Sequence, residues 1–501
     1  MQRHAVYLAL LLGLCPVAAG DVPSLPFTRV ACSTEAQAFW HASAAIDSKR
    51  IAWRPPDTAW DTRPEAMPDR IETPGTREAH RQAADHGVRH AQFTLPDSPP
   101  RPERYNVLEH GLKGDCLTPD GAALQSLVDA MPAGSTLYFP PTRSGCYLFA
   151  QTRINIPKEV TIKCQSWETV LKWDMEQAPA QGCPDTLRCN LGGLNIYHPA
   201  VTDGIYLSQV HVEGCHFQFG GARGQSIGHG TLGWKRGINI YQANDVYVAY
   251  NWVDQVTGEG IGVGNFGSAT KGNRSWLLHN YVSNFAQVGI NPNNSNNLVH
   301  GNRFETGTLA IEMGGRNTIA TRNTAVDLTD QMFAIQTTQA VVADNVCRTC
   351  YTKNPASTDG IIVVSDRGSC FGTTHLIIRG NMLLNTSAGA QVGGIVVFNS
   401  APACPPRRNA QITIEGNVIG LAIPTGIYIE QCDSCTIAYN DVQGATTALA
   451  IANRAGTVRW TAIHGNRLHG QTPLQDQSSP ADGNRIGWND LRPSSRPLPT
   501  Q

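Results

Sequence analysis

The chain has 501 residues, more than one compact core usually organises, so several domains or one elongated repeat are expected. Its 39 Lys and Arg residues balance 40 Asp and Glu residues, which argues against a generally basic nucleic-acid-binding protein. Charged residues make up only 16% of the chain and hydrophobic residues 41%, which excludes charge-rich coiled coils and wholesale disorder.

The first twenty residues have the pattern of an export signal. Arg3 and His4 precede an apolar run over 5–14, and small residues follow at 18–20. A run this short predicts a signal peptide over 1–20 and not a membrane span, which makes the protein secreted or periplasmic. Lipoprotein processing at Cys15 is the alternative. No later stretch is apolar for long enough to predict a membrane span.

Export predicts that the cysteines form disulfides, because an oxidising compartment favours these bonds. Of fourteen cysteines, Cys15 lies in the signal segment, so an odd number remains and at least one thiol is expected to be free or intermolecular. Cys347 and Cys350, like Cys432 and Cys435, have the spacing of zinc ligands, but no histidine follows at the spacing of a finger. We therefore predict disulfides that brace loops, with zinc as the alternative.

The next segment, 21–104, has no alternating strand pattern and is predicted to be an N-terminal extension packed on something larger. A helix is expected from Asp120, as its N-cap, to Ala130. Short strands over 136–139 and 160–163 follow it. At the other end of the chain, 492–501 has the composition of a polar tail.

Most of the chain repeats one unit: an apolar strand that begins Gly-Ile, a polar turn, a second strand, and an asparagine before another apolar residue. The recurring asparagines are Asn251, Asn280, Asn302, Asn323, Asn345, Asn381, Asn417, Asn440, Asn466 and Asn489. Several neighbours in this series are 21–23 residues apart, and two gaps of 36 predict insertions. Ala310-Ile311 and Ala334-Ile335 replace Gly-Ile in two repeats.

A period near 22 with three short strands per unit is typical of a parallel β-solenoid. Leucine-rich repeats share the period, but the leucine framework that they need is missing. We expect each asparagine to adopt the left-handed conformation of a tight turn. Its side-chain amide is expected to bond to the equivalent asparagine in the next coil.

Together with Gly114-Asp115 before the helix and Tyr138-Phe139-Pro140-Pro141 after it, these repeats resemble the pectate lyase-like superfamily. The resemblance implies an all-β fold: a right-handed parallel β-helix over 105–491 with a short N-terminal capping helix and an N-terminal extension. It is also the only reason to consider calcium as a cofactor. The superfamily includes lyases, hydrolases, epimerases, phage tailspikes and adhesins, so the fold does not fix the chemistry.

Strand alternation predicts which residues face outward, because in Gly-Ile-x-Val the Ile and Val point into the solenoid. The outward residues expected to bind sugar hydroxyls are Asn239, Asn291, Asn293 and Gln336, with Tyr241 beside them. The alternative is an ordinary solvated sheet face. Later coils are expected to turn Ile362, Val396 and Phe398 outward.

A cluster of cations gives a second indication of the site. The insertion between Cys215 and Gly237 and the turn after the next strand contribute Arg223, His229, Trp234, Lys235, Arg236, Lys271 and Arg274. Such a cluster can hold the carboxylates of an acidic polysaccharide and stabilise an enolate. The alternative is a surface loop whose charges pair with Asp254 and Glu259.

Glu312 and Arg316 form a third candidate group, as an acid or base with a substrate clamp, or as a simple ion pair. Tyr241, His229 and Lys235 are all chemically able to abstract a proton. We place the site between the coils of Asn239 and Gln336. Because groove residues are expected to be exposed, replacing Lys235, Arg236 or Glu312 by alanine is expected to change folding little.

These features predict a lyase, or a related uronate epimerase, that acts on an acidic, uronate-containing polysaccharide. The predicted partner is that polysaccharide, with no nucleic acid. An inverting hydrolase is the alternative, because Thr202-Asp203-Gly204 and Gly228-His229-Gly230 resemble polygalacturonase motifs; the paired aspartates between those motifs are missing. A non-catalytic carbohydrate-binding or adhesin solenoid is the third possibility.

Overall fold

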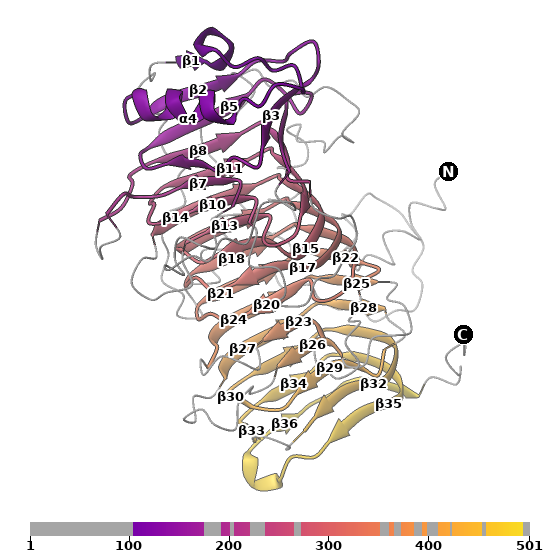
Figure 1. Ribbon diagram of the computed structural model, residues 1–501. Coiled ribbons are helices and arrows are strands. Elements are labelled where there is room, and N and C mark those ends of the chain that lie inside the picture. Colours follow the sequence, from indigo (N-terminus) through magenta and orange to yellow (C-terminus); the bar gives the residue numbers. More distant parts are fainter. Residues whose placement is uncertain are drawn as a thin grey trace, which may run out of the picture.

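The computed structural model is a solenoid of stacked parallel strands (Figure 1). It describes residues 104–174, 192–200, 205–220, 236–264, 272–350, 360–364, 372–384, 393–397, 409–420, 423–452 and 457–493. Each coil passes in turn through three ladders of strands, here called A, B and C, and strands of neighbouring coils pair in parallel. The predicted right-handed parallel β-helix is confirmed.

The three ladders run the length of the described chain. Ladder A contains β1 (Arg104–Asn106), β2 (Ser135–Phe139), β5 (Val160–Cys164), β8 (Val210–Glu213), β11 (Val246–Ala249), β14 (Asn273–Leu278), β16 (Ser295–His300), β18 (Thr318–Thr321), β21 (Ala340–Ala343), β24 (Thr374–Arg379), β27 (Ala410–Glu415), β30 (Cys432–Asp433), β31 (Thr436–Ala438), β33 (Val458–Arg459), β34 (Ala462–His464) and β36 (Arg485–Ile486). Ladder B contains β3 (Cys146–Ala150), β6 (Val170–Trp173), β9 (His216–Gln218), β12 (Trp252–Val256), β19 (Thr324–Leu328), β22 (Val346–Arg348), β25 (Met382–Leu384), β28 (Val418–Gly420) and β37 (Asp490–Pro493). Ladder C contains β4 (Ile154–Ile156), β7 (Leu194–Ile196), β10 (Ile238–Ile240), β13 (Ile261–Val263), β20 (Phe333–Ile335), β23 (Gly360–Val364), β26 (Gly393–Val397) and β29 (Thr425–Ile429). Four long strands run from B into C: β15 (Tyr281–Pro292), β17 (Arg303–Met313), β32 (Asp441–Ile451) and β35 (Arg467–Asp476).

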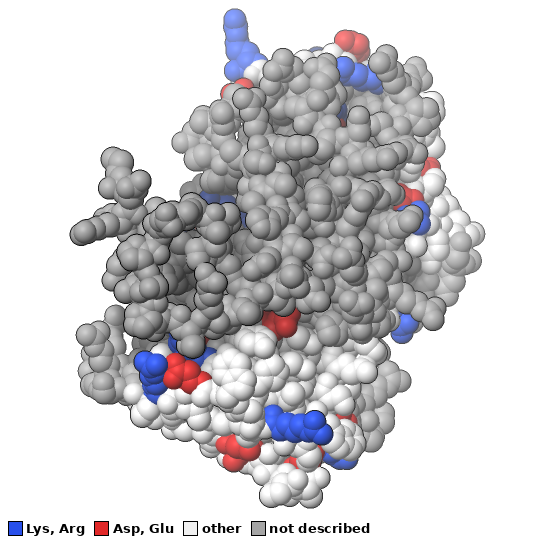
Figure 2. Space-filling model, turned by 180° about the vertical axis from the view of Figure 1, so that it is seen from behind, with Lys and Arg blue, Asp and Glu red and all other residues white. Residues whose placement is uncertain are grey.

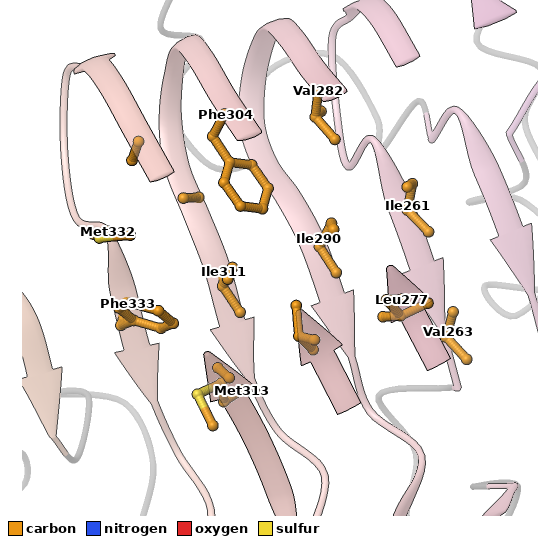
Figure 3. Close-up of a cluster of buried hydrophobic side chains, with 14 of the residues drawn as sticks. Ile261, Val263, Leu277, Val282, Ile290, Phe304, Ile311, Met313, Met332 and Phe333 are labelled. Carbon is orange, nitrogen blue, oxygen red and sulfur yellow. The ribbon is translucent and has the colours of Figure 1, made fainter. Parts of the chain in front are cut away.

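The interior is filled by columns of apolar side chains, one from each coil. On ladder C, Ile261 pairs with Ile290, Ile290 with Ile311, and Ile311 with Phe333, and all four are fully buried (Figure 3). Fully burying one such side chain contributes about 1.5–3 kcal/mol. The alternation of strand residues therefore fixes which side chains face outward on every coil.

Two register predictions on ladder C are wrong. Ile362 pairs with the inward residue Phe333 and is fully buried, so Val363, and not Ile362, faces outward. The pair Ala334-Ile335 is also not aligned with Ala310-Ile311 but displaced by two residues, because Ala334 pairs with Glu312 and Ile335 with Met313; Ile335 still points inward, as predicted. Turns of different length shift the register between coils, and a shift of one residue exchanges the two faces of a strand.

The outward position of Val396 is confirmed, because it forms a small apolar cluster with Val363 outside the main core. Phe398 lies outside the described residues.

The predicted asparagine ladder is confirmed at the turn between A and B. From Asn251 to Asn489, each side-chain amide donates to the Oδ1 of the next asparagine at 2.9–3.1 Å. The predicted left-handed backbone is displaced by one residue: it occurs before the asparagine, with φ of 56° at Tyr250 and 52° at His279. The preceding residue makes the bend, and the asparagine side chain joins the coils.

The expected capping helix is also present, as α4 (Gly121–Ala130). It closes the N-terminal end of the solenoid, because Leu124, Leu127 and Val128 belong to the core. The short 3-10 helices η2 (Val107–His110) and η3 (Pro480–Asp482) lie near the two ends. The strands expected over 136–139 and 160–163 are β2 and β5.

Asp120 has a different role from the predicted one. Its side chain makes no cap hydrogen bond to α4. Instead its buried carboxylate accepts from the backbone N–H groups of Lys113 at 2.6 Å and Gly114 at 3.0 Å. It therefore fixes the loop that precedes the helix.

Disulfides are confirmed at both short-spaced cysteine pairs, so zinc is not needed to explain them. The pairs are Cys116–Cys146, Cys164–Cys215, Cys347–Cys350 and Cys432–Cys435. Every cysteine in the described part of the chain is paired. The extension over 21–103 and the end of the tail, 494–501, lie outside it. No described helix is long and apolar enough to cross a membrane.

Candidate active site

The candidate site lies on the outward face of ladder C, where consecutive coils stack one residue above another. The outward column reads Asn155, Asn195, Asn239, Gly262, Asn291, Glu312, Ala334, Val363 and Val396. Successive coils are ~4.8 Å apart. Apart from Gly262, the column forms a polar strip as far as Glu312. Beyond Glu312 it continues with the apolar residues Ala334, Val363 and Val396 and then Tyr428.

Arg236 and Glu259 form a buried ion pair within this strip. The side chain of Arg236 is 3% exposed and that of Glu259 is fully buried. The Arg236 Nε lies 3.0 Å from Glu259 Oε2, and Nη2 donates to Oε1 at 3.2 Å. Gly262 provides the space, since a Cβ there would lie 2.8 Å from Glu259 Oε2. The charge of Arg236 is thus neutralised by Glu259, as the alternative interpretation of the cationic cluster expects.

The same guanidinium organises two further predicted residues. Its Nη1 donates to Asn239 Oδ1 at 3.0 Å and to the Tyr241 hydroxyl at 3.2 Å. Burial raises the pKa of Tyr241, although the nearby Arg236 opposes that shift. Tyr241 is therefore protonated at neutral pH and is suited to donating a hydrogen bond, not to abstracting a proton.

Amides connect this ion pair to Glu312. Asn293 Nδ2 donates to Asn291 Oδ1 at 2.7 Å, which fixes the orientation of the Asn291 amide. Asn291 Nδ2 then donates to both carboxylates, Glu259 Oε1 at 3.1 Å and Glu312 Oε2 at 3.4 Å. Gln336 Nε2 reaches Glu312 Oε1 at 3.5 Å. Glu312 is half-buried, and amides donate to both of its carboxylate oxygens.

Two predicted arginines lie at the margin of this network. Arg274 is at the start of β14 on ladder A, and pairs with Asp245 through Nε–Oδ1 at 2.5 Å and Nη2–Oδ2 at 2.6 Å. Arg316 is exposed, three residues after β17. Asp254, expected as a partner for the loop cations, lies on ladder B and accepts from Ser283 Oγ at 2.7 Å.

Five residues of the predicted cationic cluster lie outside the described part of the chain: Arg223, His229, Trp234, Lys235 and Lys271. On the face shown in Figure 2, the described charged side chains are scattered in small mixed groups. Among the described residues, no group of three or more His, Cys, Asp or Glu could hold a metal ion.

Sequence reasoning missed Glu259 as a member of the network, naming it only as a counter-ion. The sequence did contain a signal: Glu259 stands directly before Gly260-Ile261 of a ladder C strand, and the outward residue of that strand, Gly262, has no side chain to fill the space beside it. The expected exposure of the groove amides is wrong, since Asn239 and Asn291 are fully buried and Asn293 is 5% exposed. Their donors and acceptors bond to one another, which lets a polar strip be buried.

No protein-family model and no curated protein matches the sequence. Among solved structures, the chain is similar to the Dettilon tailspike protein, with a TM-score of 0.48 and 12% identity over 78% of this chain and 68% of that one. It is also similar to the catalytic unit of a GH87 α-1,3-glucanase from Streptomyces thermodiastaticus, with a TM-score of 0.48 and 12% identity over 81% and 72% of the two chains. For bacteriophage CBA120 tailspike protein 3, the values are 0.47 and 11%, over 80% of this chain but only 64% of that one, less than two thirds of its length. At these identities the likeness is one of fold alone.

Proposed function

We propose that this protein is a polysaccharide-active enzyme whose active site is the polar network on ladder C, with Glu312 as the group that moves a proton. The observation that supports this role is the environment of Glu312. It is a half-buried carboxylate whose two oxygens accept hydrogen bonds from Asn291 and Gln336. An ionised carboxylate only accepts hydrogen bonds, so donors on both oxygens favour the ionised form and fix its orientation, the state in which Glu312 can take a proton.

The proposed reaction is β-elimination or epimerisation of a uronate-containing polymer. Glu312 takes the proton from the carbon beside the uronate carboxylate. In elimination, the electron pair of that C–H bond forms a C=C bond as the neighbouring C–O bond breaks, and the leaving oxygen takes a proton from Tyr241 or water. In epimerisation, the C–O bond stays intact, and Tyr241 or water gives a proton to the opposite face of the same carbon. Either reaction needs one base and one proton donor, and not two carboxylates.

Hydrolysis is the second candidate, and one observation favours it: Glu259 and Glu312 accept from the same Asn291 amide. Hydrolysis needs two working carboxylates, and the inverting form also needs room for a water between them. Glu259 is fully buried and bound to Arg236, which suits a fixed anchor better than an acid or base. For this reason we rank elimination or epimerisation first.

Binding of the uronate carboxylate requires a cationic side chain that is not already paired with a carboxylate of the protein. Arg236 and Arg274 are paired with Glu259 and Asp245. We therefore assign binding of the uronate carboxylate to Arg316, His229, Lys235 and Lys271, and packing against a sugar ring to Trp234. Asn239 and Asn293 are assigned to holding the network in place.

We further propose that the protein is exported through the segment 1–20. The disulfides of the described residues agree with this, because such bonds form and persist in oxidising compartments.

A product screen tests the reaction class. The full chain is incubated with polygalacturonate, alginate and other uronate polymers, and absorbance near ~235 nm and new reducing ends are both measured. Elimination is expected to raise both signals. New reducing ends without absorbance would replace the lyase with the hydrolase, and inversion at one carbon without cleavage would assign the epimerase. Binding without any change in the polymer would contradict the enzyme proposal.

A further inference from the structure

The most exposed aromatic side chains of the described residues lie at the C-terminal end of the solenoid, away from the ladder C network. Trp488 is 69% exposed, Trp460 61% and Tyr439 49%. Tyr439 directly follows β31, Trp460 precedes β34 by two residues, and Trp488 follows β36 by two. They therefore stand at the two ends of the last strands of ladder A, the lowest coils in Figure 1.

Glycines hold these rings in place. A Cβ at Gly465 would lie 2.6 Å from a ring atom of Tyr439 and 3.4 Å from one of Trp488. A Cβ at Gly483 would lie 2.8 Å from a ring atom of Trp460. Each ring is thus packed against backbone on one side while much of its surface is open to solvent. Such rings are pre-positioned for a ligand, because they lose little freedom on binding.

Between Trp460 and the neighbouring rings of Tyr439 and Trp488, the outward positions carry small or polar residues. Ile486, which is 42% exposed, belongs to the inward column of the last coil. The outward positions of β31, β34 and β36 carry Thr436, Ala462 and Arg485 in one column and Ala438 and His464 in the next. Trp460 and the turn at residue 465 are five residues apart, which corresponds to about 16 Å along an extended strand. This is the length of a short oligosaccharide.

Earlier coils carry bulky apolar residues at the same outward positions. Trp276, Leu298 and Ile319 form an apolar cluster outside the main core, and they are only 2–7% exposed. The face of ladder A therefore changes at its C-terminal coils from buried apolar side chains to an open strip with aromatic ends.

We propose that this strip, defined by Tyr439, Trp460 and Trp488, binds a polysaccharide chain at a second site separate from the active site. Sugar rings present apolar C–H faces, which pack on aromatic rings, while their hydroxyls bond to polar groups such as those of His464 and Arg485. A protein partner would be matched by a contiguous apolar patch, whereas here polar and small residues separate Trp460 from Tyr439 and Trp488, whose ring centroids are 6.4 Å apart. The strip does not involve Glu312, so it stands whether or not the proposed reaction is right.

The test is native affinity electrophoresis of the full chain in gels that contain polygalacturonate, alginate or hydroxyethyl cellulose. The wild type is expected to be retarded by at least one polymer. The double variant Trp460→Ala/Trp488→Ala is expected to raise the apparent Kd at least ~10-fold. Leu491→Ala is the matched control, since Leu491 is 47% exposed on ladder B of the last coil and is expected to leave retardation unchanged. Retardation should also persist in 1 M salt, where charge interactions are screened beyond ~3 Å.

Three outcomes would overturn the proposal. The first is a wild type that none of the polymers retards. The second is a folded double variant that binds the polymer as tightly as the wild type does. This includes the outcome in which light scattering shows that the double substitution converts a dimer to a monomer while polymer binding is unchanged. The third is retardation that disappears in Glu312→Gln but not in the double variant, which would place all binding on ladder C. Circular dichroism and the unfolding midpoint confirm that each variant is folded.

Discussion

Replacing Arg236 by alanine is expected to destabilise the protein strongly, which reverses the expectation from the sequence. The replacement removes the ion pair with Glu259 and the hydrogen bonds to Asn239 and Tyr241. It leaves the Glu259 carboxylate, fully buried, without its cation. Breaking a buried pair by removing one partner costs about 3–5 kcal/mol of unfolding free energy.

Arg274→Ala is a matched control for this experiment. Arg274 also pairs with a carboxylate of the neighbouring coil, Asp245, but its side chain is 41% exposed. Solvent screens that pair, so its loss is expected to cost at most ~1 kcal/mol. The double variant Arg236→Ala/Glu259→Gln removes the stranded charge and is expected to recover part of the lost stability.

Urea unfolding followed by circular dichroism gives the three midpoints, and hydrogen exchange at β10 and β13 shows whether the loss is local. The two single variants should differ by several kcal/mol, with exchange accelerated on ladder C only in Arg236→Ala. Equal, small effects of Arg236→Ala and Arg274→Ala would refute the view that Arg236 is a structural anchor.

Two further predictions concern stability. Asn302→Ala removes four buried hydrogen bonds and is expected to lower the free energy of unfolding by about 4 kcal/mol, at ~1 kcal/mol for each bond. Asn489→Ala, on the half-exposed last coil, should lower it clearly less. Equal urea midpoints for the two variants would contradict this prediction. Burial lowers the pKa of His279 to about 4 and that of His300 well below its ordinary value, with the charges of His279 and Arg322 adding to the shift at His300. The unfolded chain then binds more protons, so this stability is complete above pH ~6.5 and falls toward pH 4 by about 1.4 kcal/mol per pH unit for each histidine. His279→Phe should flatten that slope in urea titrations at several pH values, and an unchanged slope would speak against a half-buried His279 that stays neutral in the folded protein.

The sequence was sufficient to predict the β-helix, because its asparagines make the bonds on which that prediction rested. Asn251 bonds to Asn280 in the next coil, as expected. The position of the bend was not predictable, because either the asparagine or the residue before it can take a positive φ. The structure places the bend at Tyr250 and His279.

For the candidate site, the sequence predicted the outward amides and Glu312 but not how they interact. Alternation places Asn291 and Glu312 on one face, and the structure places them within a hydrogen bond of each other. Alternation cannot show that Arg236 binds Glu259, because this pair joins two turns of adjacent coils. Nor does it fix the register of a strand such as β23, where Ile362 points inward because the preceding turn sets the phase.

The central claim is that Glu312 moves the proton, and comparing two variants of one strand tests it directly. Glu312 and Glu305 both lie on β17, but Glu305 belongs to ladder B and bonds to Arg303 at 2.8 Å, away from the amide network. Turnover is measured on the polymer identified in the product screen. Glu312→Gln should lower kcat by at least ~10²-fold with an unchanged unfolding midpoint, and Glu305→Gln should leave kcat unchanged. A Glu312→Gln variant that keeps the wild-type kcat, or a Glu305→Gln variant that loses as much, would contradict the assignment.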